Sequence, residues 1–201
     1  MQKIKIIRHS ERLDFTNPLY WMMCIGQYWA DSPLTKNGHT MAYNKGVELS
    51  DGSFNPKNIY TSPYARTMAT ATEISKSFPT ANVIIQSLLS EYQPYYAHTV
   101  SLYPNGIDTK YDGIETGIKF PESEEEFSFR VKFILEKLIT VDKSDILIVT
   151  HGEFIKKTIN YIKSVCDNIV IHSDNIPYLT VISFDYEPSV GRINPESVKI
   201  E

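Results

Sequence analysis

The sequence predicts an α/β fold: a three-layer sandwich in which helices flank a mainly parallel central sheet. Short apolar runs rich in Ile and Val recur along the 201-residue chain, and amphipathic helical stretches separate them. Alternating strands and helices are typical of parallel sheets covered on both faces. No repeat, low-complexity tract or linker interrupts the pattern. We therefore expect one domain over residues 1–201.

Composition and charge narrow the class of protein. The chain is 42% hydrophobic and 22% charged, and its net charge of −4 gives no general attraction to nucleic acid or an anionic membrane. No apolar run approaches the ~20 residues that span a bilayer, and the N-terminus lacks a signal-peptide pattern. We therefore expect a cytoplasmic protein without nucleic acid or membrane partners. Cys24 and Cys166 are expected to be free thiols.

The N-terminal half is expected to hold three strands and two helices. The strands are residues 3–8, 58–61 and 81–85. A helix over about 36–50 begins after Thr35, a good N-cap, and Gly38 allows another backbone to approach it closely. A second helix over about 63–77 has Pro63 in its first turn.

The C-terminal half continues the alternation. Ser123 and Glu126 form a capping box for a helix that runs to about residue 140, so the acidic residues beside them are expected to form a solvated first turn. The clearest strand of the chain follows at 145–150. A helix over about 153–163 and strands near 178–185 and 195–200 complete the pattern.

Two long segments, 13–35 and 91–121, are expected to be irregular and are rich in aromatic residues. Long segments without secondary structure are often functional, so each is expected to cover the C-terminal edge of the sheet. For 13–35, two interpretations stay open. Its rings bury themselves against the core, or they form a wall over the end of the first strand.

Charged side chains and histidines gather where the expected strands end. His9 ends the first strand and His151 ends the strand at 145–150, while Arg66 lies in the first turn of a helix. The carboxyl ends of parallel strands meet at one edge of a sheet, where α/β proteins bind ligands. Arg8 and Arg12 flank His9, and guanidinium groups suit an anion such as phosphate.

Four motifs occur in order along the chain. They are Arg8-His9-Ser10-Glu11-Arg12, residues 31–38 (DSPLTKNG), residues 59–71 (IYTSPYARTMATA) and Val149-Thr150-His151-Gly152. Together they resemble the histidine phosphatase superfamily, which is phosphoglycerate mutase-like. The Arg-His-x-Glu-Arg form is most similar to the eukaryotic Sts-type (RHGER-like) branch. Asp14, residues 121–123 (PES) and Arg130 support the same branch.

The resemblance implies roles for the histidines and arginines at the strand ends. His9 would be the nucleophile that takes the phosphoryl group, which requires a neutral ring with one nitrogen free. Arg8, Arg12 and Arg66 would surround the phosphate oxygens. His151 would donate a further hydrogen bond, and its protonated form would stabilise charge in the transition state.

The resemblance also places the proton donor and marks two departures from the family. Glu91 sits where the family has its acid, and an apolar or anionic neighbourhood should raise its pKa. Ser10 replaces the usual Gly. If its φ is positive, the backbone is strained; otherwise its hydroxyl is expected to add a substrate contact. Glu153, beside the site, is expected to point outward.

These features predict a metal-independent phosphomonoesterase that works through a phosphohistidine and needs no cofactor. Its substrate would be an aryl phosphate such as phosphotyrosine, a small phosphorylated metabolite or a phosphoprotein. One alternative is phosphoglycerate mutase-type transfer, which is less favoured because the covering segments contain only Lys110 and Lys119 as cations. Another is a non-catalytic phosphate-binding or scaffold domain. The other three histidines are expected at the surface, and the oligomeric state stays open, a dimer included.

Overall fold

A computed structural model describes residues 1–23, 31–93, 110–111, 121–166 and 175–201. Their strands form one sheet in the order β4-β3-β2-β5-β1-β6-β7, with β8 paired to β6. The strands are β1 (Gln2–Arg8), β2 (Asn58–Thr61), β3 (Asn82–Ile85), β4 (Lys110–Tyr111), β5 (Ile146–Thr150), β6 (Val181–Glu187), β7 (Arg192–Ile193) and β8 (Lys199–Ile200). The pairs from β4 to β1 are parallel, and those of β6 are antiparallel. This mainly parallel sheet confirms the predicted fold class.

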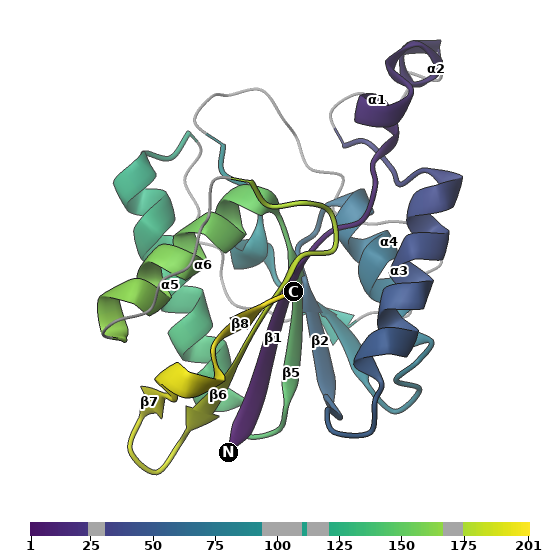
Figure 1. The fold of residues 1–201 in the computed structure, drawn as a ribbon. Helices are drawn as coiled ribbons and strands as arrows, with labels where there is room; N and C mark the ends of the chain where they lie inside the picture. Colours follow the sequence, from purple (N-terminus) through teal and green to yellow (C-terminus); the bar gives the residue numbers. More distant parts are fainter. Residues whose placement is uncertain (24–30, 94–109, 112–120, 167–174) are drawn as a thin grey trace.

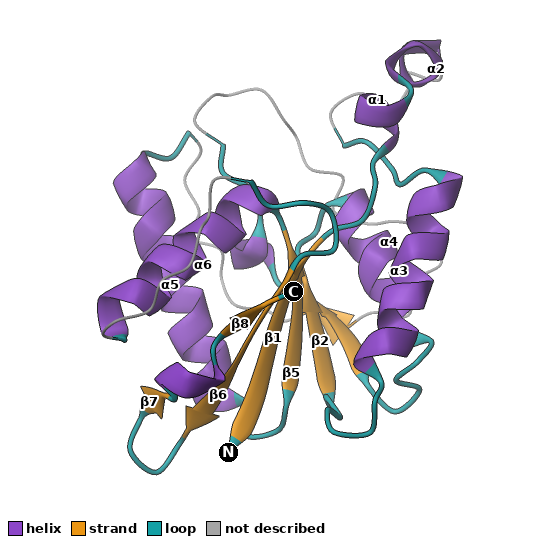
Figure 2. Ribbon diagram, viewed as in Figure 1, coloured by secondary structure: helices purple, strands orange, loops and turns teal. Residues whose placement is uncertain are grey.

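Helices cover both faces of the sheet, as Figures 1 and 2 show. The α-helices are α1 (Leu13–Thr16), α2 (Pro18–Met23), α3 (Lys36–Leu49), α4 (Ala65–Ser75), α5 (Glu124–Val141) and α6 (Gly152–Val165). α5 and α6 lie on one face and α3 and α4 on the other. Alternating side chains of the strands divide the core accordingly. Ile4 and Ile6 of β1 pack in the α5–α6 cluster, and Ile7 packs in the α3–α4 cluster.

Helix starts follow the local signals in most places. Thr35 caps α3 by accepting a hydrogen bond from the Gly38 amide at 2.8 Å. The capping box of Ser123 and Glu126 is present at the start of α5. One expectation is wrong: Pro63 lies outside α4, which begins at Ala65. Among the described residues, none of the helices is both long and apolar enough to cross a membrane.

Segment 13–35 differs from the expected irregular cover. Residues 13–23 form the short helices α1 and α2, which stand away from the sheet in Figure 1. Neither helix has a buried residue, so their rings are not packed against the core. The remaining part of the segment, 24–30 with Cys24, lies outside the described residues.

Segment 91–121 is described only at residues 91–93, 110–111 and 121. Residues 110–111 form strand β4 rather than an irregular stretch, while 94–109 and 112–120 lie outside the described residues. The C-terminal prediction also needs correction. Residues 178–180 precede β6, and 195–197 form a 3-10 helix (η3, Pro195–Ser197) ahead of β8.

Candidate active site

His9 follows β1 directly and is held by backbone groups. Its amide donates to the Thr150 carbonyl at 2.9 Å, and its side chain is 1% exposed. The ring Nδ1 lies 2.8 Å from the Ser10 carbonyl, which can only accept a hydrogen bond. Nδ1 therefore carries the proton, and Nε2 keeps its lone pair. Burial, reinforced by the nearby Arg66 charge, holds the pKa of His9 well below its usual value, so the ring is neutral.

His151 follows β5, the strand paired in parallel with β1, and side chains hold it. The two histidine rings lie 5.5 Å apart. Arg66 Nη2 lies 3.1 Å from His151 Nδ1, and Ser62 Oγ lies 2.8 Å from Nε2. Since a guanidinium only donates, Nδ1 is the acceptor, and Nε2–H donates to Ser62. Burial and the Arg66 charge keep the pKa of His151 well below its usual value.

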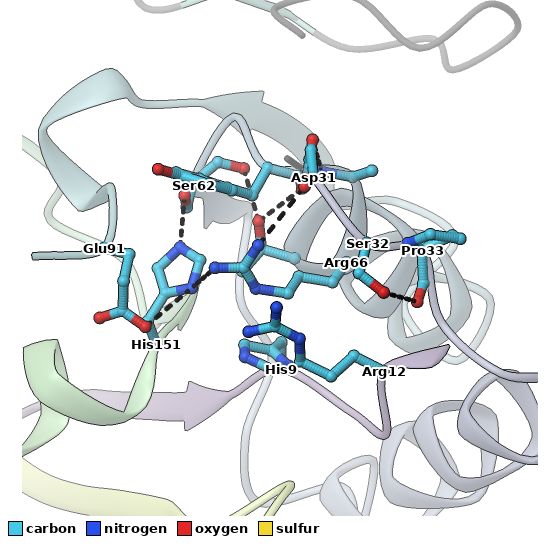
Figure 3. A network of polar contacts seen from close by, with 12 residues as sticks. His9, Arg12, Asp31, Ser32, Pro33, Ser62, Arg66, Glu91 and His151 are labelled. Carbon is cyan, nitrogen blue, oxygen red and sulfur yellow. Dashed lines mark hydrogen bonds and ion pairs between the residues drawn. The ribbon is translucent and has the colours of Figure 1, made fainter. Parts of the chain in front are cut away.

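Arg66 is the centre of the polar network in Figure 3. It lies in the first turn of α4, is 3% exposed, and reaches between His151 and Asp31. Its Nη1 lies 3.4 Å from Asp31 Oδ1, and Asp31 Oδ2 accepts from the Ala65 amide at 2.8 Å. The Asp31 carboxylate thereby ties the arginine to the start of its own helix. Arg66 Nε is buried without a hydrogen-bond partner in the described part of the chain.

Arg8 and Arg12 complete a set of three guanidiniums. Arg12 forms a two-pronged ion pair with Asp14, in which Nε donates to Oδ1 at 2.6 Å. This pairing lowers the pKa of Asp14 against the effect of its burial. Arg8 Nη1 donates to the Ile176 carbonyl, while its Nε is buried without a partner among the described residues. Arg8 and Arg66 thus each have a buried Nε–H group without a hydrogen-bond partner in the described part of the chain.

Glu91, the predicted proton donor, lies beside His151. Its Oε2 lies 3.6 Å from His151 Nδ1, and its side chain is 25% exposed. Burial raises the pKa of Glu91, the nearby Glu153 charge adds to this effect, and Arg66 opposes it. The direction of the shift is the expected one. Glu153 itself is exposed and pairs with Lys156, so it points outward as predicted.

A buried ion pair fixes the backbone that carries Glu91. Arg130 bonds both oxygens of Glu122, and its Nη1 donates to the carbonyls of Leu88 and Ser90 at 2.7 and 2.9 Å. The sequence singled out Arg130 and Glu122 only through the family resemblance. In the structure they act as a clamp on the segment before the acid.

The backbone at Ser10 is not strained. Among the described residues, Leu179 is the non-glycine residue with a positive φ, so Ser10 has ordinary backbone geometry. Its hydroxyl donates to the Gly38 carbonyl at 2.7 Å, and its amide donates to Thr70. Gly38 is required here, because a Cβ at this position would stand 2.3 Å from the Glu11 carbonyl oxygen. The Ser10 hydroxyl thus ties the loop that follows His9 to α3.

Sequence reasoning missed four residues of the site. Ser62 and Asp31 hold His151 and Arg66, and both lie within the quoted motifs, which was the available signal. Tyr64 and Tyr178 place rings beside the site arginines, 4.3 Å from the Arg66 guanidinium and 4.5 Å from that of Arg8. Tyr178 was missed because the pattern of its segment predicts a strand.

The described arrangement suits attack on a phosphorus atom. A neutral imidazole with a free nitrogen lies among three fixed cations, and a carboxyl with a raised pKa stands nearby. Of the predicted residues, His9, Arg66, Glu91 and His151 are joined by the contacts above, and the charges of Arg8 and Arg12 act on His9. The histidine expected at the surface and described here, His39, is exposed. His98 and His172 lie outside the described residues.

A known protein family and a known relative match almost the whole length of this chain. The model of the histidine phosphatase superfamily (branch 1) matches residues 5–194. An uncharacterized phosphoglycerate mutase family protein of Acanthamoeba polyphaga mimivirus, R708, is 54% identical over 201 residues, covering 100% of this chain and 98% of its own.

Solved structures share the fold at low identity. The ecdysone phosphate phosphatase of Bombyx mori has a TM-score of 0.72 and 15% identity, covering 99% of this chain and 94% of its own. A phosphoglycerate mutase of Bacillus anthracis has a TM-score of 0.64 and 22% identity, covering 98% and 92%. A phosphoserine phosphatase of Entamoeba histolytica has a TM-score of 0.62 and 21% identity, covering 99% and 97%.

Proposed function

Since this chain belongs to the histidine phosphatase superfamily, we propose that it is a phosphomonoesterase working through a phosphohistidine on His9. His9 Nε2 attacks phosphorus and the P–O bond to the leaving group breaks, while Glu91 gives its proton to the departing oxygen. Water then attacks the phosphorus, the P–N bond to His9 breaks, and the same carboxylate takes a proton from that water. Inorganic phosphate and the free alcohol are the products.

The observation that carries this proposal is the state of His9. Its Nδ1 proton is committed to the Ser10 carbonyl, and its pKa is lowered by burial, so Nε2 stays unprotonated. The free Nε–H groups of Arg8 and Arg66 supply donors for phosphate oxygens. A mere anion site would gain from a protonated histidine, whereas a nucleophile requires a neutral one.

For substrate, we favour an aryl phosphate such as a phosphotyrosine side chain. Phe15 of α1 supports this choice: it is 68% exposed and its ring lies 4.4 Å from the Arg12 guanidinium. An exposed ring beside a phosphate-binding cation offers a surface on which an aryl group can stack. Arg12 and Asp14, at the start of α1, are also among the residues that carry the resemblance to the Sts-type branch.

Labelling of His9 is the decisive test. Brief incubation with radiolabelled aryl phosphate should trap an acid-labile phosphoenzyme that is absent in His9→Ala. Turnover should fall by about 10⁴-fold or more in that variant and be unchanged by chelator. The matched control is His39→Ala, an exposed histidine on α3. Undiminished turnover in His9→Ala would refute the proposal.

A substrate panel separates hydrolysis from transfer. The panel contains p-nitrophenyl phosphate, a phosphotyrosine peptide, phosphoserine and 3-phosphoglycerate. We expect release of inorganic phosphate, fastest from the aryl compounds. Interconversion of 2- and 3-phosphoglycerate without phosphate release would instead establish a mutase.

A further inference from the structure

The segment Asn175–Thr180 wraps around Arg8 from the C-terminal part of the chain. The Thr180 carbonyl accepts a hydrogen bond from the Arg8 amide at 3.0 Å, and the Ile176 carbonyl accepts one from the Arg8 side chain. Between them, Tyr178 places its ring 4.5 Å from the Arg8 guanidinium. The same ring lies 5.7 Å from the His9 ring. This segment therefore contacts both the arginine and the nucleophile.

The turn that presents Tyr178 has an unfavourable backbone. The Thr180 amide donates to the Pro177 carbonyl at 3.3 Å and closes a four-residue turn. Its third residue, Leu179, has a φ of 60°, a conformation that usually calls for Gly. The Leu179 side chain is buried in the core with Val181, whereas the neighbouring Tyr178 side chain lies against Arg8 and His9. Strain held in place by core packing often marks a functional position.

The contacts on Arg8 leave one edge of its guanidinium group for a ligand. Nη1 is occupied by Ile176 and a ring covers the planar group, whereas Nε is buried without a described partner. Gly152 lies beside this edge, and a Cβ there would stand in van der Waals contact with Arg8 Nε, at 3.4 Å.

The same device occurs at the other arginines of the site. Tyr64 lies 4.3 Å from the Arg66 guanidinium, and Phe15 lies 4.4 Å from that of Arg12. Three rings from unrelated parts of the chain thus each face one guanidinium. A ring restricts a planar cation through cation–π attraction while leaving its edges free to donate.

From these contacts we propose that Tyr178 is a positioning residue, whose ring fixes the Arg8 guanidinium with its Nε–H directed at the phosphate. The ring face is what acts, and the hydroxyl is dispensable. This inference rests on the proposed phosphate site. It assigns the segment before β6 a part in phosphate binding.

Binding of inorganic phosphate to the full chain tests this role. Tyr178→Leu should weaken phosphate binding about 10-fold, and Tyr178→Phe should restore it to within about twofold of the wild type. In an Arg8→Gln background, Tyr178→Leu should add less than about a twofold effect, because its contribution acts through Arg8. Tyr43→Leu, at an exposed tyrosine of α3, is the matched control and should change nothing.

A second readout follows Arg8 itself. In ¹H–¹⁵N spectra, the Arg8 Nε–H of the wild type and Tyr178→Phe should be protected from exchange and shifted by the ring current. Tyr178→Leu should lose both features. Unchanged phosphate affinity and an unchanged Arg8 signal in Tyr178→Leu would overturn the proposal and leave only packing. If the wild type binds no phosphate, the proposed phosphate site fails, and a ring-dependent Arg8 signal would then show only that Tyr178 orders the guanidinium.

Discussion

His9 and His151 lie at the ends of adjacent parallel strands, are both buried, and are held by different kinds of partner. The Ser10 carbonyl fixes His9, and no side-chain substitution removes that group. His151 instead depends on the side chains of Ser62 and Arg66, both of which are buried. A nucleophile must keep one tautomer in every state, and fixation by a backbone group would provide this for the role proposed for His9.

The resting state of His151 supports this distinction. Its one proton points at Ser62, and its other nitrogen accepts from Arg66, so neither nitrogen has a proton for phosphate. Glu91 Oε2 lies 3.6 Å from that second nitrogen. The hydrogen-bond donation to phosphate that the family resemblance implies for His151 therefore requires either a second proton on the ring or a move of its proton to Nδ1.

The largest effect is expected from Glu91→Gln, which replaces the carboxyl group beside His151. Loss of the acid should slow hydrolysis of alkyl phosphates by about 10²–10⁴-fold. The effect should be much smaller for p-nitrophenyl phosphate, whose leaving group needs no proton. Steady-state rates on the two substrates measure this, and an equal loss on both would show that Glu91 acts by another route.

The pH profile sharpens the same comparison. Wild-type kcat/KM should fall as pH rises through the raised pKa of Glu91, because its acid form is lost. It should also fall at acid pH through the lowered pKa of His9, since the protonated ring cannot attack. In Glu91→Gln the alkaline limb should vanish and the acid limb should remain. Persistence of the alkaline limb would assign it to another group.

Much of this site could be predicted because its two histidines directly follow apolar strands. An apolar run followed by His9 or by His151 puts each histidine at one sheet edge, and the motif around Arg66 adds a third element. The partners of these residues were harder to predict. Asp31 and Ser62 are ordinary residue types, and their roles depend on which helix start and strand end meet in space.

Tyr178 and α1–α2 show two other limits. The residues before β6 are apolar and aromatic like a strand, but a turn with Leu179 in the left-handed region holds them outside the sheet. Residues 13–23 lack a long apolar stripe, so their two short helices left little periodic signal. The local sequence pattern predicts the elements that are buried in the core. It does not predict these two segments, which lie outside the sheet.

An intermediate effect is expected from Ser62→Ala. This variant leaves the His151 Nε2–H buried without its acceptor, which should cost about 1–3 kcal/mol of stability and lower kcat about 10-fold. Histidine ¹⁵N shifts should report a changed tautomer mixture at His151 and an unchanged one at His9. A shift at His9 as well would mean that the two rings are coupled and that their partners do not hold them independently.

The smallest effect should come from Ser10→Gly, which restores the residue usual in the family. The change removes the hydroxyl that donates to the Gly38 carbonyl at 2.7 Å but leaves the Ser10 carbonyl that fixes His9. We expect a loss of about 1 kcal/mol, seen as a fall in melting temperature of about 2–4 °C, and kcat/KM within about threefold of the wild type. A drop of tenfold or more at unchanged melting temperature would show that the hydroxyl serves the substrate rather than α3. Since the anchor of His9 is a peptide group, its tautomer should survive this substitution as it survives any other at residue 10.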